Sequence, residues 1–193
     1  MRDFSADYRW LSINTATVRK QGDFTAIVEA CARYEIRAVS PWRDQVAAVG
    51  LDRAVRAVRD AKLELSGYCR GGMFTADKAH RQEARDDNRR AVDEAKALDA
   101  PCLVLVVGGL PQFSRPGSAS SKDLASAHRM VEEEIADLLD YAQSAKMPLA
   151  IEPLHPMYAA DRACVNTLSQ ALDICDRLDP KRDDMLGVVI DVY

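Results

Sequence analysis

Short apolar runs alternate along the chain with longer segments whose apolar residues recur at helical spacing. The apolar runs are residues 10–18, 36–40, 63–68, 102–107, 148–151 and 186–190. The intervening segments follow the helical period of about 3.6 residues. They are residues 24–31, 51–61, 77–98, 124–142 and 168–178. The pattern predicts six strands and five helices in alternation, which is typical of an α/β fold with a parallel sheet and right-handed crossovers.

Several local features support these elements. The run at 102–107 has no polar alternation, which predicts a strand covered on both faces, as in parallel sheets. Asp23 and Thr167 stand where helix N-caps are expected. The helix at 77–98 carries dense charges beside a narrow face of small and apolar residues, so we predict a solvated outer face for those charges. The Pro-, Gly- and Ser-rich segment 111–121 predicts a loop.

Two architectures share this order of elements. A nucleotide-binding open sheet should carry a glycine-rich phosphate loop after an early strand, and the sequence has neither GxGxxG nor GxxxxGK[ST]. Gly71-Gly72 and Gly108-Gly109 are more simply interpreted as turns. Polar or aromatic residues do recur just after the strands, as active-site residues do in a βα barrel. They are Asn14, Trp42, Arg70, Glu152, His155 and Asp191. The sequence therefore favours a parallel (βα)8 barrel of the TIM type.

Chain length changes this interpretation. A complete barrel of this kind needs about 250 residues, and this sequence has 193. Because six strands and five helices already fill the chain, we expect residues 1–193 to form a single, incomplete TIM barrel domain. An unclosed barrel exposes two strand edges that can pair with another chain. A homo-oligomer that covers those edges is therefore one expected partner arrangement.

Composition and charge narrow the classes of function. Apolar residues make up 48% and charged residues 29%, as in ordinary soluble proteins. With 26 basic and 30 acidic residues, the net charge of −4 argues against nucleic acid or an anionic membrane as partner. The five cysteines form no CxxC pair, and no apolar stretch approaches the roughly 20 residues of a membrane span. We expect a soluble, cytoplasmic protein with reduced thiols.

Two carboxylates follow buried strands. Glu152 comes directly after Leu-Ala-Ile, and Asp191 directly after Val-Val-Ile. A carboxylate in such a place costs free energy unless it is ion-paired, hydrogen-bonded or bound to metal. An ion pair or a helix cap would explain either residue alone. Two carboxylates on adjacent strands at the same rim favour a shared cation, and oxygen ligands suit Mg²⁺, Mn²⁺ or Co²⁺.

The sequence around these carboxylates resembles a known family. Ile151-Glu152-Pro153, Val189-Ile190-Asp191 and, most specifically, the stretch EPLHPMYAADR at 152–162 are similar to xylose isomerase-like barrels. That family includes sugar isomerases and epimerases, hydroxypyruvate isomerases and inosose dehydratases. The stretches WLSINT at 10–15 and CRGG at 69–72 resemble sugar phosphate isomerase/epimerase-type proteins. The resemblance covers essentially the whole chain, and its motifs identify the superfamily better than the substrate.

The resemblance implies one divalent ion held by a Glu, an Asp, a His and a Glu on strands five to eight. Glu152 and Asp191 match the first two ligands, whereas the other two have no counterpart in this sequence. We therefore expect this chain to lack a complete active site. The implied reaction moves a proton next to a carbonyl: the metal acts as a Lewis acid that stabilises an enediolate, and Glu152 is also a base.

Three other residues carry two interpretations each. His155 either contacts a substrate hydroxyl or polarises the carbonyl, or it is a loop histidine packed between prolines. Arg162 either binds an anionic or hydroxyl group of the substrate or pairs with Asp161. Trp42 is either the wall of a sugar pocket or a core residue. Arg70 is a candidate substrate donor.

Three functions are compatible with these features. The leading one is a divalent-metal-dependent isomerase or epimerase of a sugar or related polyol. A metal-dependent lyase, either an inosose-type dehydratase or an enzyme eliminating from a 3-keto sugar, would use the same chemistry but expel a leaving group. The third is an inactive truncated barrel that self-assembles. The product separates the two enzymes, and the oligomeric state tests the third function.

Overall fold

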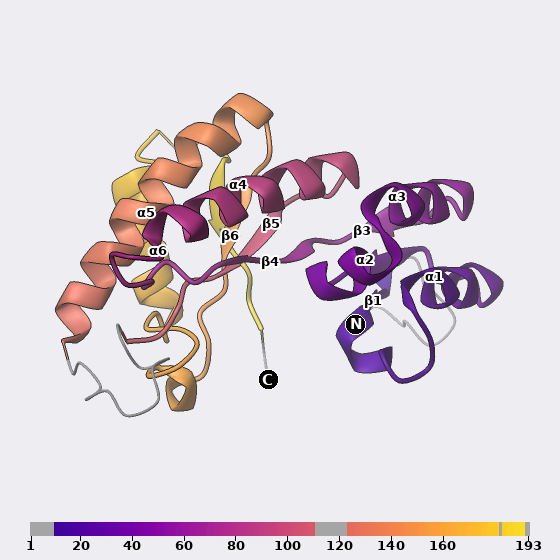
Figure 1. Ribbon diagram of the computed structural model, residues 1–193, viewed down its shortest axis with the longest axis horizontal. Coiled ribbons are helices and arrows are strands. Elements are labelled where there is room, and N and C mark those ends of the chain that lie inside the picture. Colours follow the sequence, from indigo (N-terminus) through magenta and orange to yellow (C-terminus); the bar gives the residue numbers. More distant parts are fainter. Residues whose placement is uncertain (1–9, 111–122, 182, 192–193) are drawn as a thin grey trace, which may run out of the picture. The chain divides into compact units, whose positions relative to one another are not determined.

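The structure, a computed structural model, describes residues 10–110, 123–181 and 183–191 (Figure 1). The predicted loop at 111–121 lies outside these residues. The chain divides into two compact units, Met1–Cys69 with Glu94–Cys102, and Arg70–Asp93 with Leu103–Tyr193. Whether they form one domain, as the sequence predicts, stays a prediction. Within the described residues there are seven strands and six α-helices, and no helix is long and apolar enough to cross a bilayer.

The first unit holds a three-stranded parallel sheet in the order β1-β2-β3. Its strands are β1 (Ser12–Asn14), β2 (Ala38–Ser40) and β3 (Glu64–Leu65). Its predicted helices are confirmed as α1 (Phe24–Arg33) and α3 (Leu51–Asp60). Asp23 caps α1, because its Oδ1 accepts a hydrogen bond from Ala26 N–H at 2.9 Å. The predicted strand at 10–18 is shorter than expected, since residues Thr15–Val18 form the 3₁₀-helix η2.

One helix of the first unit was not predicted. Helix α2 (Arg43–Val49) spans only seven residues and is joined to α3 by Gly50, whose φ is +87°. A segment of two turns gives too few apolar positions to define a helical face. Its first residue, Arg43, is anchored by ion-pairing to Glu94 with an Nε to Oε2 distance of 2.7 Å.

The second unit holds a four-stranded sheet in the order β4-β5-β6-β7. Its strands are β4 (Tyr68–Gly72), β5 (Leu103–Val106), β6 (Leu149–Ile151) and β7 (Leu186–Val188). Strands β5, β6 and β7 pair in parallel, and every residue of β5 and β6 is buried. This confirms the prediction of a parallel-strand α/β fold with doubly covered strands.

The predicted strand at 63–68 divides into β3 and β4. Because β4 continues through Gly71 and Gly72, the interpretation of these glycines as a turn was wrong. Both glycines belong to β4, and Gly72 has a φ of +113°. A Cβ at Gly72 would lie 2.1 Å from the Val106 carbonyl oxygen. The glycines therefore allow two backbones to approach closely, which sequence alone does not distinguish from a turn.

Three helices belong wholly or largely to the second unit. They are α4 (Arg81–Ala97), α5 (Leu124–Ala145) and α6 (Leu168–Leu178). Figure 1 shows α5 and α6 beside the strands of the second sheet. Helix α5 buries the predicted apolar face, including Val131, Ile135 and Leu138. Most of the predicted face of α4 is also buried, at Ala91, Ala95 and Leu98.

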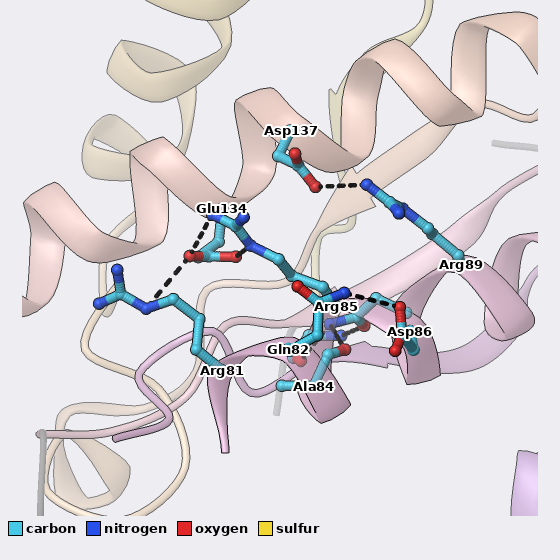
Figure 2. A network of polar contacts seen from close by, with 10 residues as sticks. Arg81, Gln82, Ala84, Arg85, Asp86, Arg89, Glu134 and Asp137 are labelled. Carbon is cyan, nitrogen blue, oxygen red and sulfur yellow. Dashed lines mark hydrogen bonds and ion pairs between the residues drawn. The ribbon is translucent and has the colours of Figure 1, made fainter. Parts of the chain in front are cut away.

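The charged side chains of α4 differ from a second prediction, which was that they form a solvated outer face. Figure 2 shows that the arginines of α4 reach acidic side chains of α5 instead of forming only a solvated face. Arg85 makes two hydrogen bonds to the Glu134 carboxylate, at 2.7 and 3.0 Å, and Arg81 lies 3.5 Å from the same group. Arg89 pairs with Asp137 at 3.2 Å. Only 4% of the Glu134 side chain is exposed, so these pairs are part of the packing between α4 and α5.

Thr167 is the predicted N-cap of α6, and the structure confirms it. Its Oγ1 accepts a hydrogen bond from Gln170 N–H at 3.2 Å, and the Gln170 side chain accepts from Thr167 N–H at 3.1 Å, which completes a capping box. We expect Thr167→Ala to lower the free energy of unfolding by about 1 kcal/mol in urea titrations. Ser169→Ala, at an exposed position of the same helix, is the control. Equal loss in both variants would contradict a capping role.

Candidate active site

Glu152 is held at the end of the second sheet by its backbone. Its N–H donates to the Leu105 carbonyl at 3.0 Å, which continues the pairing of β5 with β6. The side chain is half-buried. Burial raises the pKa of the Glu152 carboxyl above its usual value, the negative charge of Asp191 raises it further, and Arg70 opposes the rise. These three residues, all predicted for the site, therefore share one electrostatic environment.

Asp191 follows β7 and lies in a groove. Just before it, Val189 N–H donates to the Ile151 carbonyl at 2.9 Å, so the chain after β7 still follows β6. The groove has a volume of about 280 Å³. It is lined by Pro153, Leu154, His155, Pro156, Tyr158, Asn166, Leu168, Ile190 and Asp191. The structure thus brings two predicted site residues, His155 and Asp191, to one groove.

His155 has a defined hydrogen-bonding state. It precedes the 3₁₀-helix η3 (Pro156–Tyr158), and its Nδ1 accepts a hydrogen bond from Met157 N–H at 3.2 Å. A ring nitrogen that accepts a hydrogen bond carries no proton, so the neutral ring bears its proton on Nε2. The exposed His155 side chain therefore offers a donor rather than an acceptor at Nε2.

Arg162 and Trp42 have local partners. The Arg162 guanidinium lies 4.6 Å from the centre of the Tyr158 ring and 3.8 Å from Asp161, so the predicted ion pair with Asp161 is present. Trp42 belongs to the first unit, where its indole N–H donates to Asn14 Oδ1 at 2.9 Å. The substrate-binding roles of both residues stay predictions. Arg70 lies in β4, and its Nη1 contacts Met73 Sδ at 3.4 Å.

Sequence reasoning missed two asparagines that support this region. Asn166 lines the groove, and its Nδ2 donates to the carbonyls of Leu154 and Ala163, each at 2.9 Å. Asn88 is buried on α4; its Oδ1 accepts from Gly72 N–H at 2.6 Å and its Nδ2 donates to Gly72 O at 2.9 Å. Asn88 could have been found, because it interrupts the small-residue face of its helix and a buried amide needs partners.

The oxygen ligands that this region offers fit a hard divalent cation. Glu152 and Asp191 supply carboxylate oxygens, the ligands that Mg²⁺ and Mn²⁺ prefer. The raised pKa of the Glu152 carboxyl reflects burial and the like charge of Asp191, and a bound cation would offset both. Across the described parts of the chain, no group of three or more His, Cys, Asp or Glu side chains is arranged to hold a metal. The fit therefore rests on two protein ligands.

Among solved structures, this chain is similar to protein SMc04130 from Sinorhizobium meliloti 1021. The two are 57% identical, with a TM-score of 0.88, over 97% of this chain and 64% of that chain. This chain thus spans 64% of the length of that relative. A comparison with curated proteins gave no significant match.

More distant structures share the fold. A D-psicose 3-epimerase solved in the presence of D-fructose is 15% identical, with a TM-score of 0.71, over 92% of this chain and 61% of that chain. The IOLI protein, solved with a zinc atom, is 18% identical, with a TM-score of 0.73, over 93% of this chain and 62% of that chain. At these identities the likeness shows the fold alone. A family model described as xylose isomerase-like TIM barrel matches residues 25–193. The chain therefore belongs to the xylose isomerase-like TIM barrel family.

Proposed function

We propose that this chain is part of a divalent-metal-dependent isomerase or epimerase that acts on a sugar or related polyol. The observation that carries the proposal is the Glu152 carboxyl, half-buried at the end of β6 and within the electrostatic influence of Asp191 and Arg70. A general base with a raised pKa is the arrangement that proton transfer at carbon needs. The fold shared with a D-psicose 3-epimerase supports the same class of reaction.

Glu152 and Asp191 would hold the ion, and we propose Mg²⁺, Mn²⁺ or Co²⁺. When bound, the ion would supply Lewis-acid charge next to adjacent substrate oxygens. Glu152 takes the proton from the carbon next to the carbonyl; the C–H electron pair forms a C=C bond, and the carbonyl pair moves to oxygen. Return of the proton to the former carbonyl carbon, with transfer of the hydroxyl proton from the neighbouring oxygen to the former carbonyl oxygen, gives an isomer. Return of a proton to the opposite face of the first carbon, with the carbonyl re-formed, gives an epimer.

Three other residues of the second unit would bind and orient the substrate. His155 donates through Nε2–H to a substrate oxygen, because Nδ1 is occupied by Met157 N–H. Arg70 donates beside Glu152, and its positive charge favours the ionised carboxylate that acts as base. Arg162 is a proposed contact of the sugar by hydrogen bonding, and a sugar contact of Trp42 stays a prediction from the sequence. A cytoplasmic location is proposed as well, since all five cysteines are free thiols.

Turnover and its metal dependence test this proposal. The longest protein that contains this chain is incubated with a panel of ketoses and aldoses in D₂O, with and without Mn²⁺. We expect an isomer or epimer that has gained deuterium from solvent, and loss of turnover when EDTA removes the metal. An unsaturated ketone formed with loss of water or aglycone would instead identify a lyase. Turnover that survives complete metal removal would contradict the metal-dependent mechanism.

Self-association remains a separate proposal for the 193-residue chain. Strand β7 is the outer strand of the second sheet, and the following Ile190 is 66% exposed. Leu168 and Leu172 of α6 are exposed as well. We expect light scattering after size exclusion to show a dimer or larger species, and Ile190→Lys to shift it toward monomer. A monomer at all concentrations for the parent chain would contradict this expectation.

A further inference from the structure

Asn166 has both of its amide hydrogens committed to the backbone. Its Nδ2 lies 2.9 Å from the Leu154 carbonyl oxygen, 2.9 Å from that of Ala163 and 3.5 Å from that of His155. All three neighbours are acceptors, so the reversed amide would place oxygen against oxygen. The orientation of the Asn166 side chain is therefore fixed by its surroundings, with Oδ1 on the side away from these carbonyls.

The Asn166 Oδ1 atom is an available acceptor. Within residues 10–110, 123–181 and 183–191, no group donates a hydrogen bond to it. The residue is half-buried and lines the groove that also contains His155 and Asp191. The chain has two other asparagines, and both differ: Asn14 Oδ1 accepts from Ala16 N–H and the Trp42 indole, and Asn88 Oδ1 accepts from Gly72 N–H.

His155 provides the complementary group in the same groove. Because its Nδ1 accepts from Met157 N–H at 3.2 Å, its Nε2 carries the proton of the neutral ring. The backbone of His155 lies next to Asn166, since Asn166 Nδ2 is 3.5 Å from the His155 carbonyl oxygen, and both residues line the groove. Leu154, Leu168 and Ile190 line the groove around them. A fixed acceptor and a fixed donor thus lie within an otherwise largely apolar wall.

We propose that Asn166 Oδ1 and His155 Nε2–H form a hydroxyl-binding subsite for a neutral part of the substrate. A hydroxyl group both donates and accepts, so one hydroxyl, or two on neighbouring carbons, can satisfy both protein groups. A carboxylate oxygen has no proton to give Asn166, and the charge of Asp191 in the same groove repels an anion. The subsite selects hydroxyls over anionic groups. Its assignment to a polyol substrate rests on the proposed function.

Carbon-13 labelling of the asparagine carboxamide carbon, Cγ, tests the Asn166 acceptor in the 193-residue chain. Three resonances are expected, one for each asparagine. D-Fructose is titrated in the presence of EDTA, with tetrahydropyran and acetate as probes that lack hydroxyl groups. We expect the Asn166 resonance to move with D-fructose alone, while those of Asn14 and Asn88 stay fixed. A stationary Asn166 resonance, or equal movement of all three, would overturn the proposal.

Histidine nitrogen shifts and one variant test the donor. We expect His155 to show an unprotonated Nδ1 and a protonated Nε2 in the free chain; the reverse tautomer would overturn the assignment. His155→Asn keeps a side-chain acceptor for Met157 N–H, but its shorter side chain has no donor at the position of Nε2–H. This variant should bind D-fructose about three- to tenfold more weakly, which is the loss expected when one hydrogen bond is removed, and its fold should be unchanged. Unchanged affinity would count against the donor role.

The subsite and the proposed function can fail separately. In the Glu152→Gln chain, the D-fructose response of Asn166 should persist, because the subsite uses neither Glu152 nor a metal. If Asn166 does not respond while the longer protein shows metal-dependent turnover, the subsite is wrong and the proposed function stands. If Asn166 responds while no isomerase or epimerase activity exists, the subsite stands and the proposed function is wrong.

Discussion

Glu152→Gln is expected to lower turnover by about 10²- to 10⁴-fold in a longer protein that contains this chain, without loss of folding. The amide has the shape of the carboxylate but can neither accept a proton from carbon nor supply a charged ligand. Burial and Asp191 raise the pKa of the Glu152 carboxyl, so its ionisation is less favourable in the folded chain than in the unfolded chain. Removing that charge should therefore leave stability equal or slightly higher.

Initial rates and urea unfolding on the same preparations separate these two effects. Glu83→Gln is the matched control, because Glu83 is an exposed glutamate in the first turn of α4. We expect it to keep full turnover and stability. Retained turnover in Glu152→Gln would contradict the role of Glu152 as base, and a large loss of stability would show that the residue is structural.

Arg85→Leu is expected to lower the free energy of unfolding by about 3 kcal/mol, because it leaves a buried carboxylate without its main partner. Glu134 has only 4% of its side chain exposed and accepts two hydrogen bonds from Arg85. Arg81, at 3.5 Å, is its remaining ion-pair partner (Figure 2). Urea titration of the 193-residue chain measures the loss. Arg90→Leu, which removes the exposed pair with Asp87, should cost under about 1 kcal/mol.

A double variant tests the cause of that loss. Arg85→Leu with Glu134→Leu removes both charges and leaves apolar side chains between α4 and α5. Apolar replacements of buried pairs are often neutral, so most of the lost stability should return. A double variant no more stable than Arg85→Leu alone would show that lost packing, not the unpaired charge, causes the effect.

Periodicity predicted the elements that have long or continuous patterns. Helices α1, α3, α5 and α6 are each ten or more residues long and repeat apolar residues at helical spacing, and β5 is an unbroken apolar run. Helix α2 has seven residues, too few for such a face to be recognised. Strand β4 was misread because Gly71-Gly72 is equally typical of a turn. Only the neighbouring backbone at Val106 explains why glycine is needed there.

The site was predictable where sequence position alone carries the chemistry. Glu152 and Asp191 follow apolar runs, so their place at strand ends can be read directly from the order of residues. The roles of Asn166 and Asn88 depend on backbone groups that only the fold brings near: Asn166 bonds to Leu154, and Asn88 to Gly72. For the same reason, the arginines of α4 could be placed on one face, but their partners on α5 could not be identified.

The most direct test of the metal site is titration of the isotope-labelled 193-residue chain with Mn²⁺, followed by paramagnetic broadening of its NMR signals. We predict that broadening is strongest around Glu152 and Asp191, the two carboxylates proposed as ligands, and that Glu152→Gln removes this local effect. Weak binding is expected from two protein ligands. Broadening centred elsewhere, or unchanged broadening in Glu152→Gln, would contradict a metal site at these residues.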